Sequence, residues 1–132
     1  MRRLHLVVGF TFAAVFAATG AYMRVGFPEL HGGDNVVRMM YRSAHVYILL
    51  GALLNLGVAS HMPPPTPRCL GRRIASITIL LVPMVFTAAF FLEPHPERFE
   101  RIITQAGLAL AAGGTLGHVI LSRWPRPLDD VD

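Results

Sequence analysis

Long runs of apolar residues, separated by short polar connections, dominate the pattern of this chain. Each run is about 20 residues long, and an α-helix of that length spans about 30 Å, the thickness of the hydrocarbon core of a bilayer. The pattern predicts helices over residues 4–24, 39–60, 72–92 and 101–122. A soluble domain of 132 residues cannot bury four helices that are apolar on all sides. We therefore expect an all-α membrane protein, in which a single domain, residues 1–132, forms an antiparallel up-down bundle of four transmembrane helices.

The composition agrees with a membrane protein and narrows the classes of partner. Hydrophobic residues make up 53% of the chain and charged residues only 15%. The net charge of +4 does not indicate nucleic-acid binding, because the basic residues lie in connections and at helix ends and do not follow one face. All 12 basic residues are arginine, which we attribute to a GC-rich bacterial genome. The expected partners are the lipid bilayer and either further copies of the chain or another membrane protein.

The arginines also predict an orientation, because basic connections tend to remain in the cytoplasm. If the N-terminus is inside, the internal arginines are Arg2, Arg3, Arg68, Arg72, Arg73, Arg123 and Arg126. The external arginines are then Arg24, Arg38, Arg42, Arg98 and Arg101. The larger internal set predicts a multi-pass protein of the bacterial inner membrane with both termini in the cytoplasm.

The second apolar run carries a polar stripe at steps of three and four residues, the spacing of one helical face. The stripe consists of Arg38, Tyr41, His45, Ile48, Ala52, Asn55 and Ala59. In lipid, a polar stripe must turn toward protein or water. We therefore expect this face, with Ala52 and Asn55 as packing residues, to contact the other helices or a partner subunit.

Two further features predict how the third and fourth helices pack. Pro83 cannot donate a hydrogen bond to the carbonyl of Ile79, so it predicts a kink, which is tolerated when neighbouring helices satisfy the freed carbonyl. Gly113 and Gly117 form a G-x-x-x-G pair, a pattern that favours close contact between helices. That contact belongs either to the bundle or to an oligomer.

One polar side chain from each helix is predicted at a similar depth, about 8 Å below the external face by helical rise. These residues are Thr19, His45, Thr87 and Gln105. Arg42 lies one turn from His45, and Tyr41 is close to both in sequence. We predict that all six residues form a ligand-binding site centred on His45.

The alternative for this external layer is a buried hydrogen-bond cluster that fixes the register of the helices. In that interpretation a carboxylate neutralises one of the arginines of the second helix. The candidate pairs join Glu93 or Glu100 to Arg42 or Arg38.

A second polar layer lies near the internal face and contains His5, His61 and His118, from three different helices. Two imidazoles that face each other across a bundle can hold a haem iron, and histidine is also a common metal ligand. No pair has a diagnostic spacing, and a hydrated histidine at the interface needs no special role. Haem or metal binding by these three histidines and a purely structural role both stay open.

The segment Arg42-Ser43-Ala44-His45, with Asn55 further along, resembles the membrane-associated family of eicosanoid and glutathione enzymes. The resemblance implies a trimer that binds glutathione between subunits through arginines of this region. The chain lacks the Asn and Glu that this family carries within two turns after the arginine. It also lacks the family's Arg–Tyr signature between the third and fourth helices, where residues 93–98 read EPHPER.

No catalytic triad, phosphate loop or nucleotide fingerprint occurs in the sequence. We therefore favour a non-enzymatic accessory, scaffold or oligomer-forming subunit with a buried polar cluster around His45. One alternative is a haem-, quinone- or lipid-binding protein that uses His45 or the three internal histidines. The other is the glutathione-dependent membrane enzyme that the resemblance implies.

Overall fold

The computed structural model describes residues 1–30, 35–61, 70–94 and 100–123, without the side chains of residues 27–30, 122 and 123. The regular elements of these segments are four α-helices, and no strand occurs among them. The helices are α1 (Arg2–Leu30), α2 (Asn35–His61), α3 (Leu70–Leu92) and α4 (Ile102–Arg123). The all-helical prediction is therefore confirmed, and each of the four helices is long and apolar enough to cross a membrane.

The helices extend beyond some of the apolar runs that predicted them. α1 continues from residue 24 to Leu30, and α2 begins at Asn35 instead of residue 39. Backbone hydrogen bonding does not require apolar side chains, so a helix can continue into polar residues at its ends. α3 ends at Leu92, just before Glu93 and Pro94, because the proline ring disfavours a helical conformation in the residue that precedes it.

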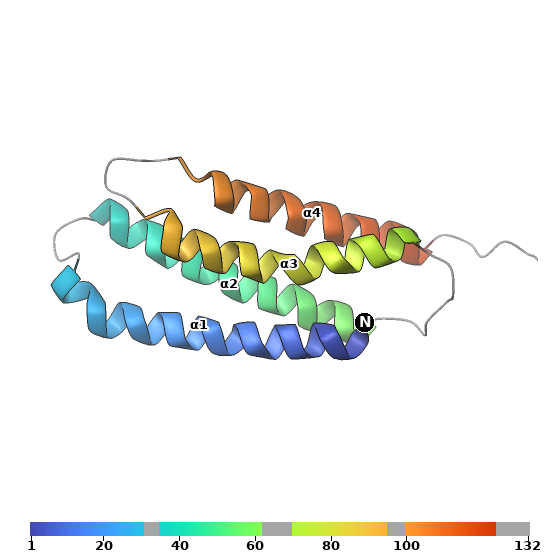
Figure 1. The fold of residues 1–132 in the computed structure, drawn as a ribbon, viewed down its shortest axis with the longest axis horizontal. Helices are drawn as coiled ribbons and strands as arrows, with labels where there is room; N and C mark the ends of the chain where they lie inside the picture. The colour runs from blue at the N-terminus through green and yellow to red at the C-terminus, as the bar shows by residue number, and fades with distance from the viewer. Residues whose placement is uncertain (31–34, 62–69, 95–99, 124–132) are drawn as a thin grey trace, which may run out of the picture.

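The helices pack in chain order, α1 against α2, α2 against α3, and α3 against α4. Figure 1 shows them side by side, with consecutive helices running in opposite directions. α2 and α3 occupy the centre, and within the described segments the backbones of α1 and α4 do not approach each other. The arrangement is thus an open succession of neighbouring pairs.

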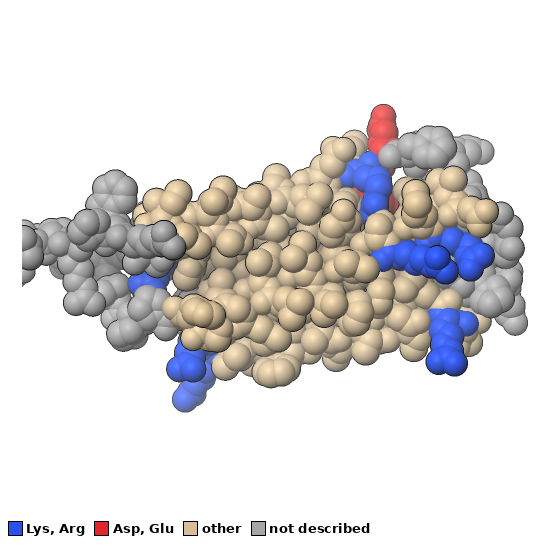
Figure 2. All heavy atoms as spheres, turned by 180° about the vertical axis from the view of Figure 1, so that it is seen from behind, with Lys and Arg blue, Asp and Glu red and all other residues tan. Residues whose placement is uncertain are grey.

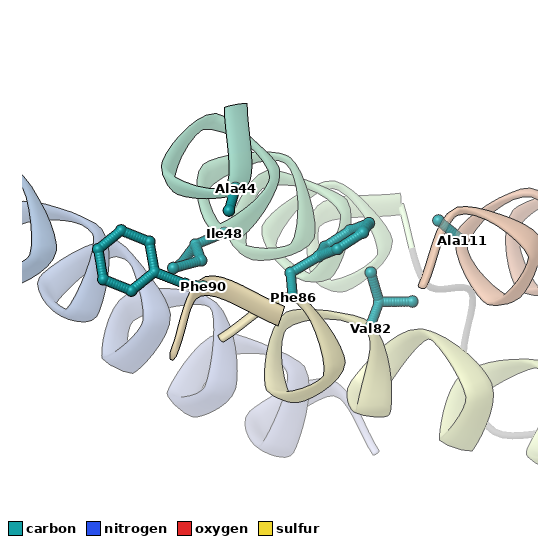
Figure 3. Close-up of a cluster of buried hydrophobic side chains, with 6 residues drawn as sticks. All are labelled: Ala44, Ile48, Val82, Phe86, Phe90 and Ala111. Atoms are coloured by element: carbon teal, nitrogen blue, oxygen red, sulfur yellow. The ribbon is translucent and has the colours of Figure 1, made fainter. Parts of the chain in front are cut away.

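The centre of the molecule is filled mainly by α2 and α3. A buried hydrophobic cluster joins three helices, and its members are Ala44 and Ile48 of α2, Val82, Phe86 and Phe90 of α3, and Ala111 of α4. Figure 3 shows the two α2 side chains turned toward α3, from which the phenyl rings rise. Tyr47 of α2 stacks on Phe86 with ring centroids 5.2 Å apart, so aromatic packing fixes this part of the α2–α3 contact.

α2 and α3 approach each other most closely where a glycine faces the proline of α3. A Cβ atom on Gly51 would lie 2.8 Å from the Cα of Pro83, so only glycine fits at this position. Figure 1 shows the axis of α3 bending near its middle, as a proline inside a helix requires.

α4 packs against α3 through a face of small residues. A Cβ atom on Gly107 would lie 2.6 Å from the ring of Phe86, and one on Gly114 would lie 2.9 Å from Cγ1 of Ile79. The absence of side chains at these two glycines therefore lets α4 lie close to α3.

The G-x-x-x-G pair of the sequence is not the centre of this contact. A Cβ atom on Gly113 would meet nothing within 4 Å, and one on Gly117 would make only an ordinary contact, 3.5 Å from Cβ of Ala75. Gly113 therefore faces away from the other helices, because one residue turns the side-chain direction by about 100° and Gly114 occupies the contact instead.

Large apolar side chains are exposed on all four helices, whereas charged side chains gather toward the ends. Figure 2 shows a tan surface in the middle of the molecule, with arginines toward both ends of the face in view. The exposed apolar residues include Phe10 of α1, Leu53 of α2, Met84 and Phe91 of α3, and Leu116 and Ile120 of α4. The middle of the molecule therefore presents hydrocarbon to its surroundings.

Candidate functional site

Of the residues expected in the external polar layer, Thr19 of α1 and His45 of α2 are in contact. Oγ1 of Thr19 lies 2.9 Å from Nδ1 of His45. The same hydroxyl lies 3.0 Å from the carbonyl oxygens of Val15 and Phe16, to which it donates. Since a hydroxyl has a single proton, Nδ1–H of His45 donates to Oγ1, and Nε2 of the neutral ring is left as the acceptor.

Packing holds the His45 ring flat against α1. The ring stacks on Phe16 at a centroid distance of 3.9 Å and an interplanar angle of 17°. A Cβ atom on Gly20 would lie 3.2 Å from Cε1 of His45, so the glycine provides room for the imidazole. His45 thus joins α1 to α2 through one hydrogen bond and one stacked pair.

The other members of the predicted external site point elsewhere. Thr87 donates to the carbonyl of Pro83 in its own helix at 2.8 Å, and Gln105 is exposed on α4. Tyr41 packs edge-on against Phe90, with centroids 5.1 Å apart. Arg42 is exposed and lines a separate pocket near the start of α2. The structure therefore brings Thr19 and His45 together and separates them from these four, because the direction of each side chain depends on the rotation of its helix.

A polar cluster that the sequence pattern does not predict lies at the same end of the molecule. Glu93, which is 7% exposed, accepts the backbone N–H of Thr104 at 2.8 Å and also the hydroxyl of Thr104. Its Oε2 lies 3.6 Å from Nε of Arg101, whose Nη1 donates to Ser43 at 2.7 Å. Glu93 therefore pairs with Arg101, and neither Arg38 nor Arg42 is its partner.

This cluster caps α4. Thr104 is the third residue of α4, and its N–H is one of the donors that a helix leaves free at its first turn. A carboxylate at this end is also favoured by the helix dipole. No local signal marks this contact in the sequence, because Glu93 lies nine residues before α4 begins and an N-cap residue lies directly before its helix.

At the opposite end, Asn55 of α2 links three helices. Nδ2 donates to the carbonyl of Gly51 at 2.9 Å and to the carbonyl of Ile79 in α3 at 3.0 Å. Ile79 is the residue whose carbonyl Pro83 leaves without a partner in the helix. The amide of Asn55 therefore completes the hydrogen bonding of the α3 kink from the neighbouring helix.

The third bond of Asn55 fixes the tautomer of a buried histidine. Oδ1 lies 2.7 Å from Nδ1 of His5 in α1, and both residues are 0% exposed. Because the carbonyls of Gly51 and Ile79 can only accept, Nδ2 must face them and Oδ1 must face His5. The Nδ1 atom of His5 is then the donor, and Nε2 of the neutral ring keeps its lone pair.

A groove of about 480 Å³ opens beside this network, between the inner halves of α2 and α4. Its walls are mostly apolar side chains of α2, namely Leu50, Leu53, Leu54 and Val58. Thr115 and His118 of α4 supply polar groups. They are three residues apart and so lie on one face of α4.

The two polar groups of the groove have unused hydrogen-bonding capacity. Oγ1 of Thr115 and Nε2 of His118 are buried atoms that find no hydrogen-bond partner among the described residues, and His118 as a whole is 7% exposed. Arg72 of α3 lies close enough to His118 for its charge to interact with the imidazole. The groove thus combines an apolar wall with two free polar atoms and a nearby positive charge.

The three internal histidines do not form one centre. His61 is exposed at the end of α2, where its Nδ1 lies 2.9 Å from Oγ of Ser60 and 3.0 Å from the carbonyl of Gly57. His5 is held by Asn55, and His118 faces the groove, which His61 also lines. Among the residues that the structure describes, no group of three or more His, Cys, Asp or Glu side chains could hold a metal ion.

The groove is the arrangement with the clearest chemistry. The hydroxyl of Thr115 and the imidazole of His118 can each donate or accept a hydrogen bond. The leucine and valine walls suit the apolar body of a ligand that these two groups bind. Comparisons of the chain with protein-family models, with curated proteins and with solved structures found no match.

Proposed function

We propose that this chain is a non-enzymatic, multi-pass protein of a bacterial inner membrane that binds a lipid-soluble molecule with a carbonyl head group, the chemistry of a quinone, in the groove between α2 and α4. The four helices would form an antiparallel up-down bundle across the bilayer, with both termini in the cytoplasm. The observation that carries the ligand proposal is the pair of buried polar atoms without a partner, Oγ1 of Thr115 and Nε2 of His118.

Membrane insertion is supported by the distribution of apolar surface. Soluble monomers rarely expose contiguous apolar patches of more than a few hundred Å², roughly 300–600 Å² at most. This chain exposes large apolar side chains along all four helices, with the described arginines gathered toward the ends. Hydrocarbon around the middle and water at the two ends would satisfy both sets of side chains.

The size and polarity of the groove support a small amphipathic ligand. Its volume of about 480 Å³ lies within the range of ordinary ligand pockets, roughly 300–1,000 Å³. A buried polar atom without a partner costs about 1–3 kcal/mol, and a ligand oxygen that accepts from both groups would recover much of that cost. The positive charge of Arg72 acts on His118, and it would also favour a ligand oxygen with partial negative charge next to that imidazole.

The experiment measures thermal unfolding of the purified protein in neutral detergent, with and without a short-chain quinone. A ligand that binds only the folded state stabilises it, by about 2.7 kcal/mol at a concentration of 100 times the Kd. We expect His118→Leu and Thr115→Val each to reduce this stabilisation. Thr11→Val is the matched control, since Thr11 is exposed on α1 and lies outside the groove. No stabilisation of the wild type, or equal stabilisation of all variants, would contradict the proposal.

A second arm identifies the source of the carbonyl group, because the ester of a phospholipid presents the same chemistry. Native mass spectrometry of the protein released from mixed-lipid nanodiscs would detect lipid that stays bound. Retention of a phospholipid that His118→Leu abolishes, without any effect of the quinone, would assign the groove to lipid.

The scaffold interpretation rests on a different surface and stays a prediction. Gly113 faces open space on α4, where a helix of a second copy or of a partner protein could approach closely. A native mass larger than that of the monomer, reduced by Gly113→Leu, would support an oligomer. Haem binding through His5 and His118 predicts a Soret band after haem-replete expression, and the glutathione interpretation predicts a thermal shift with glutathione.

A further inference from the structure

Three arginines line a pocket at the end of the molecule opposite the groove. Arg24 comes from the last turns of α1, and Arg38 and Arg42 come from the first turns of α2. With Met23 they line a pocket of about 210 Å³. We propose that this pocket binds a phosphate group at the membrane surface.

The clustering of charge points to an anion. Arg38 and Arg42 are four residues apart, a spacing at which like charges on a helix repel each other, and Arg24 adds a third guanidinium from α1. Arginine stays charged at all ordinary pH values, so this repulsion cannot be relieved by loss of a proton. A bound anion relieves it directly.

Arg101, a fourth arginine at the same end, differs from these three because it is paired with a carboxylate. Arg101 has its carboxylate, Glu93, and this pair is the salt bridge that the described part of the chain contains. Among the residues that the structure describes, no carboxylate neutralises these three guanidinium groups, and a bound phosphate would do so.

The geometry suits a tetrahedral oxyanion better than a single carboxylate. Each guanidinium presents a planar fork of donors that matches two oxygens of a phosphate, and three forks from two helices can surround such a group. Since one water takes up about 30 Å³ of liquid, the pocket volume corresponds to roughly seven waters, enough for a phosphate and part of its hydration shell.

The position near the ends of two proposed spans predicts that the phosphate belongs to the headgroup of an anionic phospholipid. Free phosphate has the same chemistry, so the experiment has two arms. The first measures phosphatidylglycerol retained by the protein after release from phosphatidylcholine nanodiscs that contain it, by native mass spectrometry. The second measures the thermal unfolding of the protein in neutral detergent with inorganic phosphate or with chloride at equal ionic strength.

The test variant replaces all three arginines by glutamine (Arg24→Gln, Arg38→Gln, Arg42→Gln), and Arg38→Gln alone serves as a milder variant. The control is Arg73→Gln, an exposed arginine at the other end of the molecule. We expect the triple variant to retain about eightfold less phosphatidylglycerol, about a factor of two for each arginine, as for solvent-exposed ion pairs. Arg38→Gln alone should lose about that factor of two, and Arg73→Gln should lose nothing.

The outcomes separate the two sources. Loss of retained phosphatidylglycerol without a phosphate-specific thermal shift assigns the pocket to a lipid headgroup, and a thermal shift with phosphate that the variants abolish assigns it to free phosphate. Equal retention by the wild type, the triple variant and Arg73→Gln, together with no phosphate-specific shift, overturns the proposal. Neither arm depends on the groove between α2 and α4, so failure of one proposal leaves the other standing.

Discussion

At the scale of single residues, Asn55 shows how much one buried amide can determine. It makes three hydrogen bonds, to α1, to its own helix and to α3, and it is 0% exposed. A polar group that is buried away from water must find a partner within the protein, and all three bonds of Asn55 do so. Through Asn55 the tautomer of His5 and the kink of α3 depend on the same side chain.

Replacement of each buried histidine by leucine is expected to change the unfolding free energy in a different way. His5→Leu removes the donor to Asn55 and leaves its Oδ1 buried without a partner, which should cost about 1–3 kcal/mol of unfolding free energy. His118→Leu removes an atom that has no partner among the described residues, so the ligand-free protein should keep its stability or gain some. Unfolding curves of the two variants in detergent without quinone measure this difference. Equal destabilisation by both substitutions would show that His118 has a structural partner.

At the scale of helices, the contact between α2 and α3 is built around Pro83. Gly51 lets the proline approach, and Asn55 satisfies the carbonyl of Ile79 that the proline frees. The sequence predicts the kink and the need for a partner, since both follow from the chemistry of proline. It does not predict which residue is the partner, because that depends on how the two helices are rotated and shifted relative to each other.

A double-mutant cycle tests this link. Pro83→Ala restores an N–H that can bond to the carbonyl of Ile79, so Asn55→Ala should cost less in that background than in the wild type. Coupled neighbouring residues typically show an interaction energy of about 0.5–3 kcal/mol. We expect a value in that range from unfolding free energies of the four proteins. Additive effects would show that Asn55 acts independently of the proline.

The rotation of α4 shows the limit of what the apolar pattern predicts. Small residues occur all round this helix, so its composition does not single out a contact face. Gly113 and Gly117 match a known motif, yet Gly114 is the glycine that meets Ile79. For the same reason Gln105, predicted in the external layer, lies on the exposed side of α4.

The adjacent glycines form a matched pair for testing that rotation. Gly114→Leu would push side-chain atoms into Ile79, and such overpacking typically costs about 1–3 kcal/mol. Gly113→Leu meets open space within one copy of the chain and should leave the unfolding free energy of the monomer unchanged. The reverse order of the two effects in thermal unfolding would place Gly113 at the helix contact.

At the scale of the whole molecule, the positions of the four helices follow from the sequence more directly than the site does. Each run of about 20 apolar residues is long enough to form a helix of several turns, and this length can be read directly from the sequence. The polar contacts depend on three-dimensional packing, and only Thr19 and His45 of the predicted external layer meet. The pair of Glu93 and Arg101 spans a connection whose course the apolar pattern does not specify.

The orientation of the whole molecule can be tested with its single cysteine, Cys69, which lies in the connection between α2 and α3 and outside the described residues. With both termini in the cytoplasm, this connection is also cytoplasmic. We expect a membrane-impermeant maleimide to label Cys69 only after the cells are permeabilised.

A cysteine placed at the other end of the helices provides the control. Glu100 is exposed just before α4, so Glu100→Cys in a Cys69→Ser background should be labelled in intact cells. Labelling of Cys69 and protection of residue 100 in intact cells would reverse the proposed orientation.

The packing of the helices in chain order has a consequence for biogenesis. Each main interface joins two helices that leave the ribosome one after the other. The average sequence separation between contacting residues is therefore small. Proteins with such local contacts tend to fold fast. α1 and α2 can pack together before α3 and α4 have been synthesised, because the main contact of α1 is with α2 and, within the described part of the chain, it makes none with α4. Two fragments, divided between α2 and α3 and expressed together, should accordingly reassemble into the native arrangement.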